Sequence, residues 1–212
     1  MLQLQQIHYA PATASEPILR GIELYAAPGR PVLVAGESGS GKSSLLEVIS
    51  GLASNKSGTI RWNGSILNQR QRRALCGMVF QFPERYFLGL TITQELKLGH
   101  RRLSTDRINQ ILRRVGLEQI DRTMAPERLS GGQQRRLSLA VQLLRGAQVL
   151  LLDEPTAGLD WSVRDDVLSL LADLARDQVL IVVTHEPELF QRWACDRHRL
   201  EAGQLTSLTT LP

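Results

Sequence analysis

Residues 31–50 read P-V-L-V-A-G-E-S-G-S-G-K-S-S-L-L-E-V-I-S. The first five form a short apolar run, typical of a buried strand, and a glycine-rich turn follows. Residues 43–50 then carry apolar side chains at helical spacing, at Leu45, Leu46 and Ile49. The order of strand, glycine-rich loop and helix predicts one unit of an α/β fold with a parallel sheet.

The turn matches the pattern G-x-x-x-x-G-K-[ST], in which glycines let backbone N–H groups point at phosphate oxygens. The following helix adds the favourable end of its dipole. Lys42 is expected to reach the outer phosphates, and the Ser43 hydroxyl to bind Mg²⁺. A flexible turn without a ligand is the alternative. The predicted ATP-binding residues of this loop are Gly36, Glu37, Ser38, Gly39, Ser40, Gly41, Lys42, Ser43 and Ser44.

Two further apolar runs end in side chains suited to phosphate chemistry. Residues 149–154 read V-L-L-L-D-E, and residues 179–185 read V-L-I-V-V-T-H. Strands that are apolar on both faces are typical of a parallel sheet between helices, and such sheets bind ligands at the carboxyl ends of their strands. We predict that Asp153 holds Mg²⁺, that Glu154 is the general base and that His185 reaches the γ-phosphate. The alternatives are a helix cap or solvated turn for the acids and a structural histidine.

Two single residues complete the predicted site. Gln81 follows a strand expected over residues 78–82 and is predicted to offer an oxygen to Mg²⁺ and to assist catalysis as a nucleotide sensor. Tyr9 lies upstream of the phosphate loop in an alternating stretch. Its ring is predicted to stack on adenine, with core packing as the alternative.

The remaining pattern predicts one domain with an inserted helical segment. Residues 59–62 indicate a short hairpin strand, and residues 84–128 show a helical pattern. A further helix is expected from about Gln133 to Gly146, and another over residues 162–175 between the two apolar strands.

We therefore divide the single domain, residues 1–212, into two parts. The ATP-binding core with its β-subdomain takes residues 1–83 and 134–212, and the helical subdomain takes residues 84–133.

Composition restricts the class of protein. The 212 residues are 42% hydrophobic and 22% charged, which is typical of a soluble globular domain. The longest apolar runs are far shorter than the roughly 20 residues that cross a bilayer, and no secretory signal is visible at the start. Cys76 and Cys195 are too few and too far apart for a disulfide framework.

The net charge of +4 leaves nucleic acid open as a partner, but the arginines are scattered in short groups. No aromatic side chains interleave with them as a base-stacking surface requires, so we expect solvated helical faces and no nucleic acid. The groups are Arg70, Arg72 with Arg73, Arg101 with Arg102, Arg113 with Arg114, and Arg135 with Arg136.

A second phosphate-binding element is predicted at residues 129–133, which read L-S-G-G-Q. Ser130, Gly131 and Gly132 place a hydroxyl and two bare backbones just before a helical pattern that begins near Gln133. One chain thus carries two such elements.

These motifs in this order resemble the nucleotide-binding domain of ABC ATPases. The resemblance rests on the phosphate loop, Gln81, L-S-G-G-Q, V-L-L-L-D-E-P, A-G-L-D at residues 157–160 and His185, and it covers essentially the whole chain. It implies an ATPase with a P-loop (RecA-like) parallel-sheet core, a small antiparallel β-subdomain and an inserted α-helical subdomain.

The resemblance also implies how the second element is used. In this family the signature of one subunit, here Ser130, Gly131, Gly132 and Gln133, closes over the ATP on the partner's phosphate loop in a head-to-tail dimer. Asp160 would communicate between the two sites across the interface. The pair is either two copies of this chain or this chain with a paralogue.

Within the family, F-Q-F-P-E-R at residues 80–85 and the T-I-T-Q-E-L that follows resemble ATPases of energy-coupling-factor and cobalt- or nickel-type importers. The resemblance implies a peripheral subunit on the cytoplasmic face of a membrane, docked near Gln81 on a transmembrane subunit. The end at Pro212 and the presence of Trp161 resemble short cyanobacterial and plastid forms. The alternative is a soluble ABC ATPase such as one that assembles iron–sulfur clusters.

Overall fold

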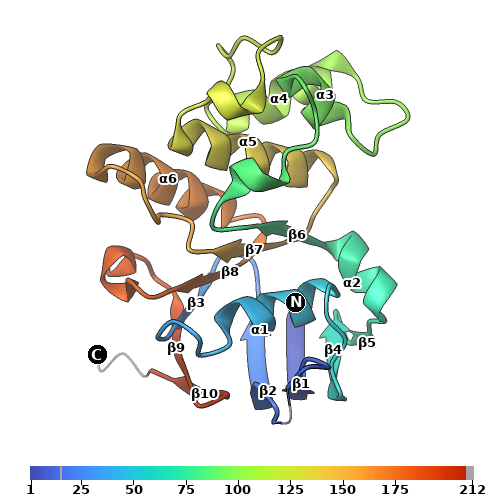
Figure 1. Cartoon of the computed structure of the whole chain (residues 1–212), viewed down its shortest axis with the longest axis vertical. Helices are drawn as coiled ribbons and strands as arrows, with labels where there is room; N and C mark the ends of the chain where they lie inside the picture. The colour runs from blue at the N-terminus through green and yellow to red at the C-terminus, as the bar shows by residue number, and fades with distance from the viewer. Residues whose placement is uncertain (15, 209–212) are drawn as a thin grey trace.

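Two sheets form the frame of the computed structural model, which describes residues 1–14 and 16–208 (Figure 1). The larger sheet has the order β10-β9-β3-β8-β7-β6, and all its neighbouring strands are parallel except β10, which is antiparallel to β9. Its strands are β3 (Val32–Ala35), β6 (Cys76–Val79), β7 (Val149–Asp153), β8 (Val179–Thr184), β9 (Asp196–Glu201) and β10 (Gln204–Ser207).

The smaller sheet is antiparallel, with the order β2-β1-β4-β5. Its strands are β1 (Leu2–Tyr9), β2 (Leu19–Ala26), β4 (Ser57–Trp62) and β5 (Ser65–Ile66). The two sheets match the parallel core and the small antiparallel β-subdomain that the sequence predicts.

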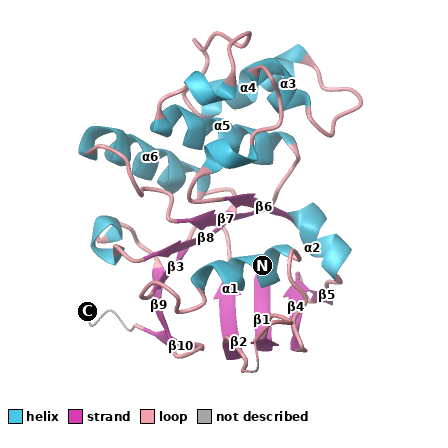
Figure 2. Ribbon diagram, viewed as in Figure 1, coloured by secondary structure: helices cyan, strands magenta, loops and turns pink. Residues whose placement is uncertain are grey.

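The helices lie on both sides of the larger sheet (Figures 1 and 2). On one side α1 separates the larger sheet from the smaller one, and on the other side α5 and α6 cover the sheet, with α3 and α4 beyond α5. The helices are α1 (Lys42–Ser50), α2 (Gln69–Leu75), α3 (Ile92–Lys97), α4 (Thr105–Arg114), α5 (Gly131–Leu144) and α6 (Trp161–Leu174).

The parallel strands are buried on both faces, as predicted. In β7, Leu150 and Leu152 belong to the apolar core beneath α5 and α6, whereas Val149 and Leu151 belong to the core shared with α1 and the smaller sheet. Each of the four is 0% exposed, and burying such a side chain contributes about 1.5–3 kcal/mol. This double burial holds the carboxyl end of β7 in place between two cores.

Several boundaries differ from the predicted ones by one to three residues. The strand expected over residues 78–82 is β6, which begins at Cys76 and ends at Val79, where its pairing with Leu152 of β7 ends. The hairpin strand expected over residues 59–62 begins two residues earlier, as β4, and α6 begins and ends one residue before the predicted 162–175. The helix expected from about Gln133 begins at Gly131.

The helical segment predicted for residues 84–128 is interrupted in the structure. The segment contains only α3, α4 and single turns of 3-10 helix at Pro83–Tyr86 and Pro126–Arg128, joined by loops. Proline begins each of the two turns, and it has no N–H to continue a ladder. Because α5 runs on from Gly131, the predicted subdomain boundary between residues 133 and 134 falls within its first turn.

The sequence did not indicate β2, α2 or the β9–β10 hairpin. Within the described residues, no helix is both long enough and apolar enough to cross a lipid bilayer.

Candidate functional site

The phosphate loop joins the end of β3 to the start of α1, as predicted. The Gly36 N–H donates to the Thr184 carbonyl at the end of β8 (3.3 Å), so the loop lies where two parallel strands end. Gly41 has φ 101°, a conformation that L-residues rarely adopt, and a Cβ there would lie 2.9 Å from the Ile18 methyl group. Only glycine fits this turn.

Lys42 is 8% exposed and its ammonium group lies beneath the loop. Its Nζ donates to the carbonyl oxygens of Gly36 (2.7 Å) and Glu37 (2.9 Å), and it lies 3.9 Å from Glu154 Oε1. Two carbonyls and a nearby carboxylate therefore hold a positive charge at the carboxyl edge of the sheet.

Asp153 ends β7 directly beside the first turn of α1. The Ser43 hydroxyl donates to Asp153 Oδ2 at 2.7 Å, across 110 residues of sequence. Burial raises the pKa of Asp153 above its ordinary value; the Ser43 hydrogen bond acts in the opposite direction, and the neighbouring Glu154 carboxylate raises it further. The Ser43 and Asp153 oxygens thus lie close together, and a bound cation would stabilise the negative charge of the Asp153 carboxylate.

Glu154 follows with a left-handed backbone, φ 47°. Its N–H donates to the Val183 carbonyl of β8 (3.0 Å), and its side chain is buried. Oε2 accepts from the His185 N–H (3.2 Å) and Oε1 lies 2.8 Å from His185 Nδ1. The hydrogen bond and the charge of Glu154 raise the pKa of His185. An unusual backbone conformation thus points a buried carboxylate at a lysine and a histidine.

One cavity of about 590 Å³ collects most of the predicted residues. This volume is within the range of small-molecule sites. The residues that line it are Ile18, Ser38, Gly39, Gly41, Lys42, Ser43, Ser44, Gln81, Asp153, Glu154 and His185. Of these only Ile18 was missed, because an apolar residue before β2 carries no chemical signal in the sequence.

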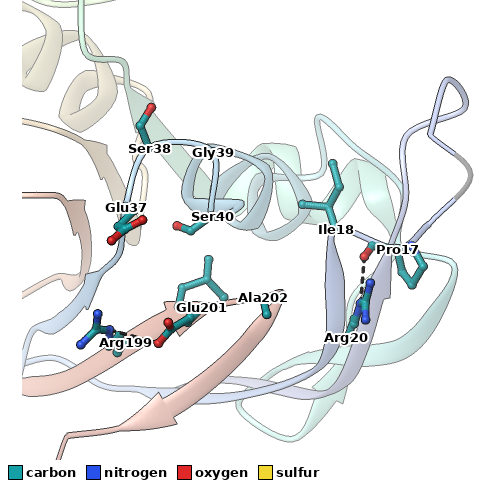
Figure 3. Close-up of a pocket in the computed structure, with 12 residues that line it drawn as sticks. Pro17, Ile18, Arg20, Glu37, Ser38, Gly39, Ser40, Arg199, Glu201 and Ala202 are labelled. Atoms are coloured by element: carbon teal, nitrogen blue, oxygen red, sulfur yellow. Dashed lines mark hydrogen bonds and ion pairs between the residues drawn. The ribbon is translucent and has the colours of Figure 1, made fainter.

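A second cavity, of about 390 Å³, lies on the other side of the same loop (Figure 3). Residues 37–40 line this cavity together with the β9–β10 turn and the chain entering β2. Gly36 is placed so close to this hairpin that a Cβ would meet the Leu200 carbonyl at 2.6 Å. The hairpin therefore supports the phosphate loop from behind.

Tyr9 lies outside the residues that line these two cavities. It ends β1 partly buried and packs against the core that β1 shares with α1.

Ser130–Gln133 lie at the start of α5, away from the residues that line the larger cavity. The Ser130 hydroxyl accepts from the Gln133 N–H (3.4 Å), and Gln133 Oε1 accepts from the Ser130 N–H (3.0 Å). The first intrahelical hydrogen bond runs from the Gln134 N–H to the Ser130 carbonyl. The N–H groups of Gly131 and Gly132 precede this bond, and the capping box does not use them. Among the described residues no acceptor is recorded for the N–H groups of Gly131, which is exposed, and Gly132, which is buried against Val163.

With this geometry in place, the chain can be compared with known proteins. A family model described as "ABC transporter" matches residues 19–157. The chain belongs to the ABC transporter family. Its ATP-binding domains are ATPases, so this protein binds and hydrolyses ATP.

Three relatives illustrate the match. "ABC transporter I family member 11, chloroplastic" of Arabidopsis thaliana is 34% identical, over 95% of this chain and 78% of the relative. "Energy-coupling factor transporter ATP-binding protein EcfA1" of Lactiplantibacillus plantarum is 33% identical, over 84% and 67%. The solved structure of cbiO1 from Clostridium perfringens, described as part of the ABC transporter complex cbiONQ, has a TM-score of 0.85 at 26% identity, covering 97% of this chain and 86% of that one.

Two arginines of this ABC ATPase correct the expectation of solvated helical faces. Arg72 and Arg135 are each 4% exposed. Arg72 donates to the Val48 carbonyl at the end of α1 (2.9 Å), and Arg135 donates to two carbonyls that follow β7. Only tertiary contacts distinguish these two from their solvated neighbours, because each stands beside another arginine in the sequence.

Asp160 of the ABC ATPase is exposed at the N-cap position of α6 and makes no side-chain capping hydrogen bond. Leu159 and Val163 on either side of it lie against the start of α5: a Cβ on Gly131 would be 3.2 Å from Leu159, and one on Gly132 would be 2.3 Å from Val163. The A-G-L-D segment and the signature thus share one surface region.

Proposed function

We propose that this ABC ATPase is the motor subunit of an energy-coupling-factor-type importer of a metal ion or vitamin. One observation carries the mechanism: Lys42, Ser43 with Asp153, and Glu154 with His185 line one cavity, while the N–H groups of Gly131 and Gly132 lie outside its lining. A second subunit placed head to tail supplies the missing donors to the nucleotide. The pair is a homodimer or a heterodimer with a paralogue.

The roles at the site follow from its contacts. The backbone of residues 36–44 and Lys42 bind the phosphates of ATP, and Glu154 takes a proton from the attacking water. His185, 2.8 Å from Glu154, orients that carboxylate and reaches the γ-phosphate. Tyr9 stacks on adenine in this proposal, and the base then lies beyond the residues that line the larger cavity.

Mg²⁺ fits the residues present. The Ser43 hydroxyl and Asp153 carboxylate lie 2.7 Å apart, and Gln81 lines the same cavity. Within the described residues no group of three or more His, Cys, Asp or Glu side chains could hold a metal alone. Mg²⁺ takes few protein oxygens and several from phosphates and water, and it would neutralise phosphate charge when bound.

A signature variant tests the dimer. Ser130→Arg should leave ATP binding by the monomer unchanged but reduce ATP hydrolysis to the background rate. The reason is that a long cationic side chain blocks the partner's approach to the start of α5. Nucleotide titration and phosphate release measure the two effects. Ser104→Arg is the matched control. Ser104, like Ser130, is an exposed serine at a helix N-cap, and its hydroxyl accepts from the Arg107 N–H in α4 (3.2 Å). Normal hydrolysis by Ser130→Arg would exclude the trans signature.

The transmembrane partner is supported by relatives named as transporter components and by an exposed apolar loop. Leu88 and Leu90 are each 80% exposed between β6 and α3. The loop is nevertheless fixed: the N–H groups of Leu88 and Gly89 both donate to the buried Glu95 carboxylate at 2.8 Å, and the Leu90 N–H donates to Gln94 (2.9 Å). A rigid apolar surface a few residues after Gln81 in the chain suits docking on a membrane subunit at the cytoplasmic face.

Affinity purification tests this docking. The tagged protein, extracted from its own membranes in mild detergent, should retain a polytopic membrane protein. Leu88→Asp combined with Leu90→Asp should lose that protein while the isolated subunit keeps its ATPase rate, because these side chains lie outside the cavity. Ile66→Asp is the control, since Ile66 is 56% exposed on β5.

Retention of a soluble scaffold in place of a membrane protein would contradict the transport role and favour iron–sulfur cluster assembly. Unchanged retention of the membrane protein by the Leu88 and Leu90 double variant would contradict only the docking surface.

A further inference from the structure

Arg135 connects the signature helix to the backbone of the catalytic carboxylate. Arg135 lies one turn into α5. Its guanidinium donates from Nη1 to the Glu154 carbonyl (2.9 Å) and from Nη2 to the Ala157 carbonyl (2.8 Å). The Ala157 N–H also donates to the Glu154 carbonyl (3.1 Å). A buried fork of two charged hydrogen bonds therefore closes the turn that follows β7.

The Arg135 guanidinium is buried near carboxylates from other segments of the chain. Burial lowers the pKa of Arg135, whereas the carboxylates of Glu84, Asp153 and Glu154 act in the opposite direction. Glu84 belongs to the turn that follows Gln81, so the guanidinium lies among groups from three separate segments. Removing it would take one donor from the buried Glu154 carbonyl and one from the partly buried Ala157 carbonyl, and would leave three carboxylates without this cation.

The Glu154 backbone is where such a contact matters most. A left-handed conformation at a non-glycine residue is unfavourable by itself and persists only where its surroundings hold it. The Val183 carbonyl holds Glu154 from its N–H side, and Arg135 holds it from its carbonyl side. Between these two contacts the side chain is directed toward Lys42 and His185.

We propose that Arg135 is a positioning residue that couples the two nucleotide sites of the dimer. This rests on the head-to-tail arrangement proposed above. In that arrangement the α5 start of one chain binds the nucleotide of one site, while Glu154 of the same chain acts at the other. Within one chain, Arg135 links the start of α5 directly to Glu154. The close packing of Gly132 on Val163 also ties α5 to the segment that follows Ala157. Nucleotide bound at one site thereby sets the orientation of the base at the other.

The test compares Arg135→Met and Arg135→Lys with wild type. Arg135→Met should keep the monomer's affinity for ATP, because the phosphate loop is untouched. Its kcat per nucleotide-binding molecule should fall about ten- to a hundredfold, the effect of losing hydrogen bonds from a charged donor. Its Hill coefficient for ATP should fall to 1 from a wild-type value between 1 and 2, the limit for two sites. Arg135→Lys keeps the charge but not the fork, so its kcat should lie between the two.

Arg145→Met is the matched control, since Arg145 is an exposed arginine at the end of the same helix. It should match wild type in kcat and in Hill coefficient. A purely structural role for Arg135 would lower the melting temperature but leave both quantities unchanged in the folded fraction. If Arg135→Met does not fold, Arg135→Lys decides the question by the same two measurements.

Wild-type kcat and cooperativity in the folded Arg135 variants would overturn the proposal, as would a wild-type Hill coefficient of 1. These outcomes are distinct from failure of the dimer itself. If the hydrolysis-deficient Glu154→Gln protein stays monomeric with ATP and Mg²⁺, the head-to-tail arrangement fails. If it dimerises while the Arg135 variants behave as wild type, only the coupling fails.

Discussion

Glu154→Gln should lower kcat for ATP hydrolysis by about a hundredfold or more while ATP binding is retained. The amide keeps the size of the side chain and can still accept the His185 N–H, but it cannot take a proton from water. Lys42 at 3.9 Å no longer faces a negative charge, which favours binding of the anionic nucleotide. Bound ATP should then persist between two subunits, and size-exclusion chromatography with ATP and Mg²⁺ should show a stable dimer.

The control for this variant is Glu188→Gln, an exposed carboxylate in the 3-10 turn that follows His185. It should hydrolyse ATP at the wild-type rate and elute as wild type does. The assignment of Glu154 as general base is wrong if Glu154→Gln retains most of its turnover. The dimer assignment is wrong if the variant binds ATP and yet elutes only as a monomer.

Lys42→Ala should weaken ATP binding by about a hundredfold, as expected for loss of a charged hydrogen-bond donor to phosphate. The change also leaves the carbonyls of Gly36 and Glu37 without the ammonium group that they now share, at 2.7 and 2.9 Å. The loop that cradles the phosphates loses its internal support together with its charge. Isothermal titration calorimetry with ATP and Mg²⁺ measures the affinity.

Lys56→Ala serves as the control, because Lys56 is an exposed lysine before β4. Its affinity for ATP should equal that of wild type. Equal affinity in Lys42→Ala would contradict the phosphate-binding assignment of the whole loop at residues 36–44.

Most residues that line the larger cavity were predictable because each motif is local. The G-x-x-x-x-G-K-[ST] turn, the acids after β7 and the histidine after β8 each follow an apolar strand directly, and parallel strands end at one edge. Local pattern failed where proline and loops interrupt helical spacing, as in residues 84–128. It failed also for Arg135, whose burial depends on carbonyls about 20 residues further along the chain.

The sequence by itself determined the strand–loop–helix unit of β3 and α1, the buried strands β7 and β8, the residues of the phosphate loop and the acids at the end of β7, since these depend on side-chain type and spacing within a few residues. Tertiary structure alone decided the 2.7 Å pairing of Ser43 with Asp153, the direction in which Glu154 points and the placement of Ser130–Gly132 outside the cavity. The reason is physical. Each of these depends on packing two cores against one sheet and on hydrogen bonds between residues 19 to 110 positions apart, which no local pattern encodes.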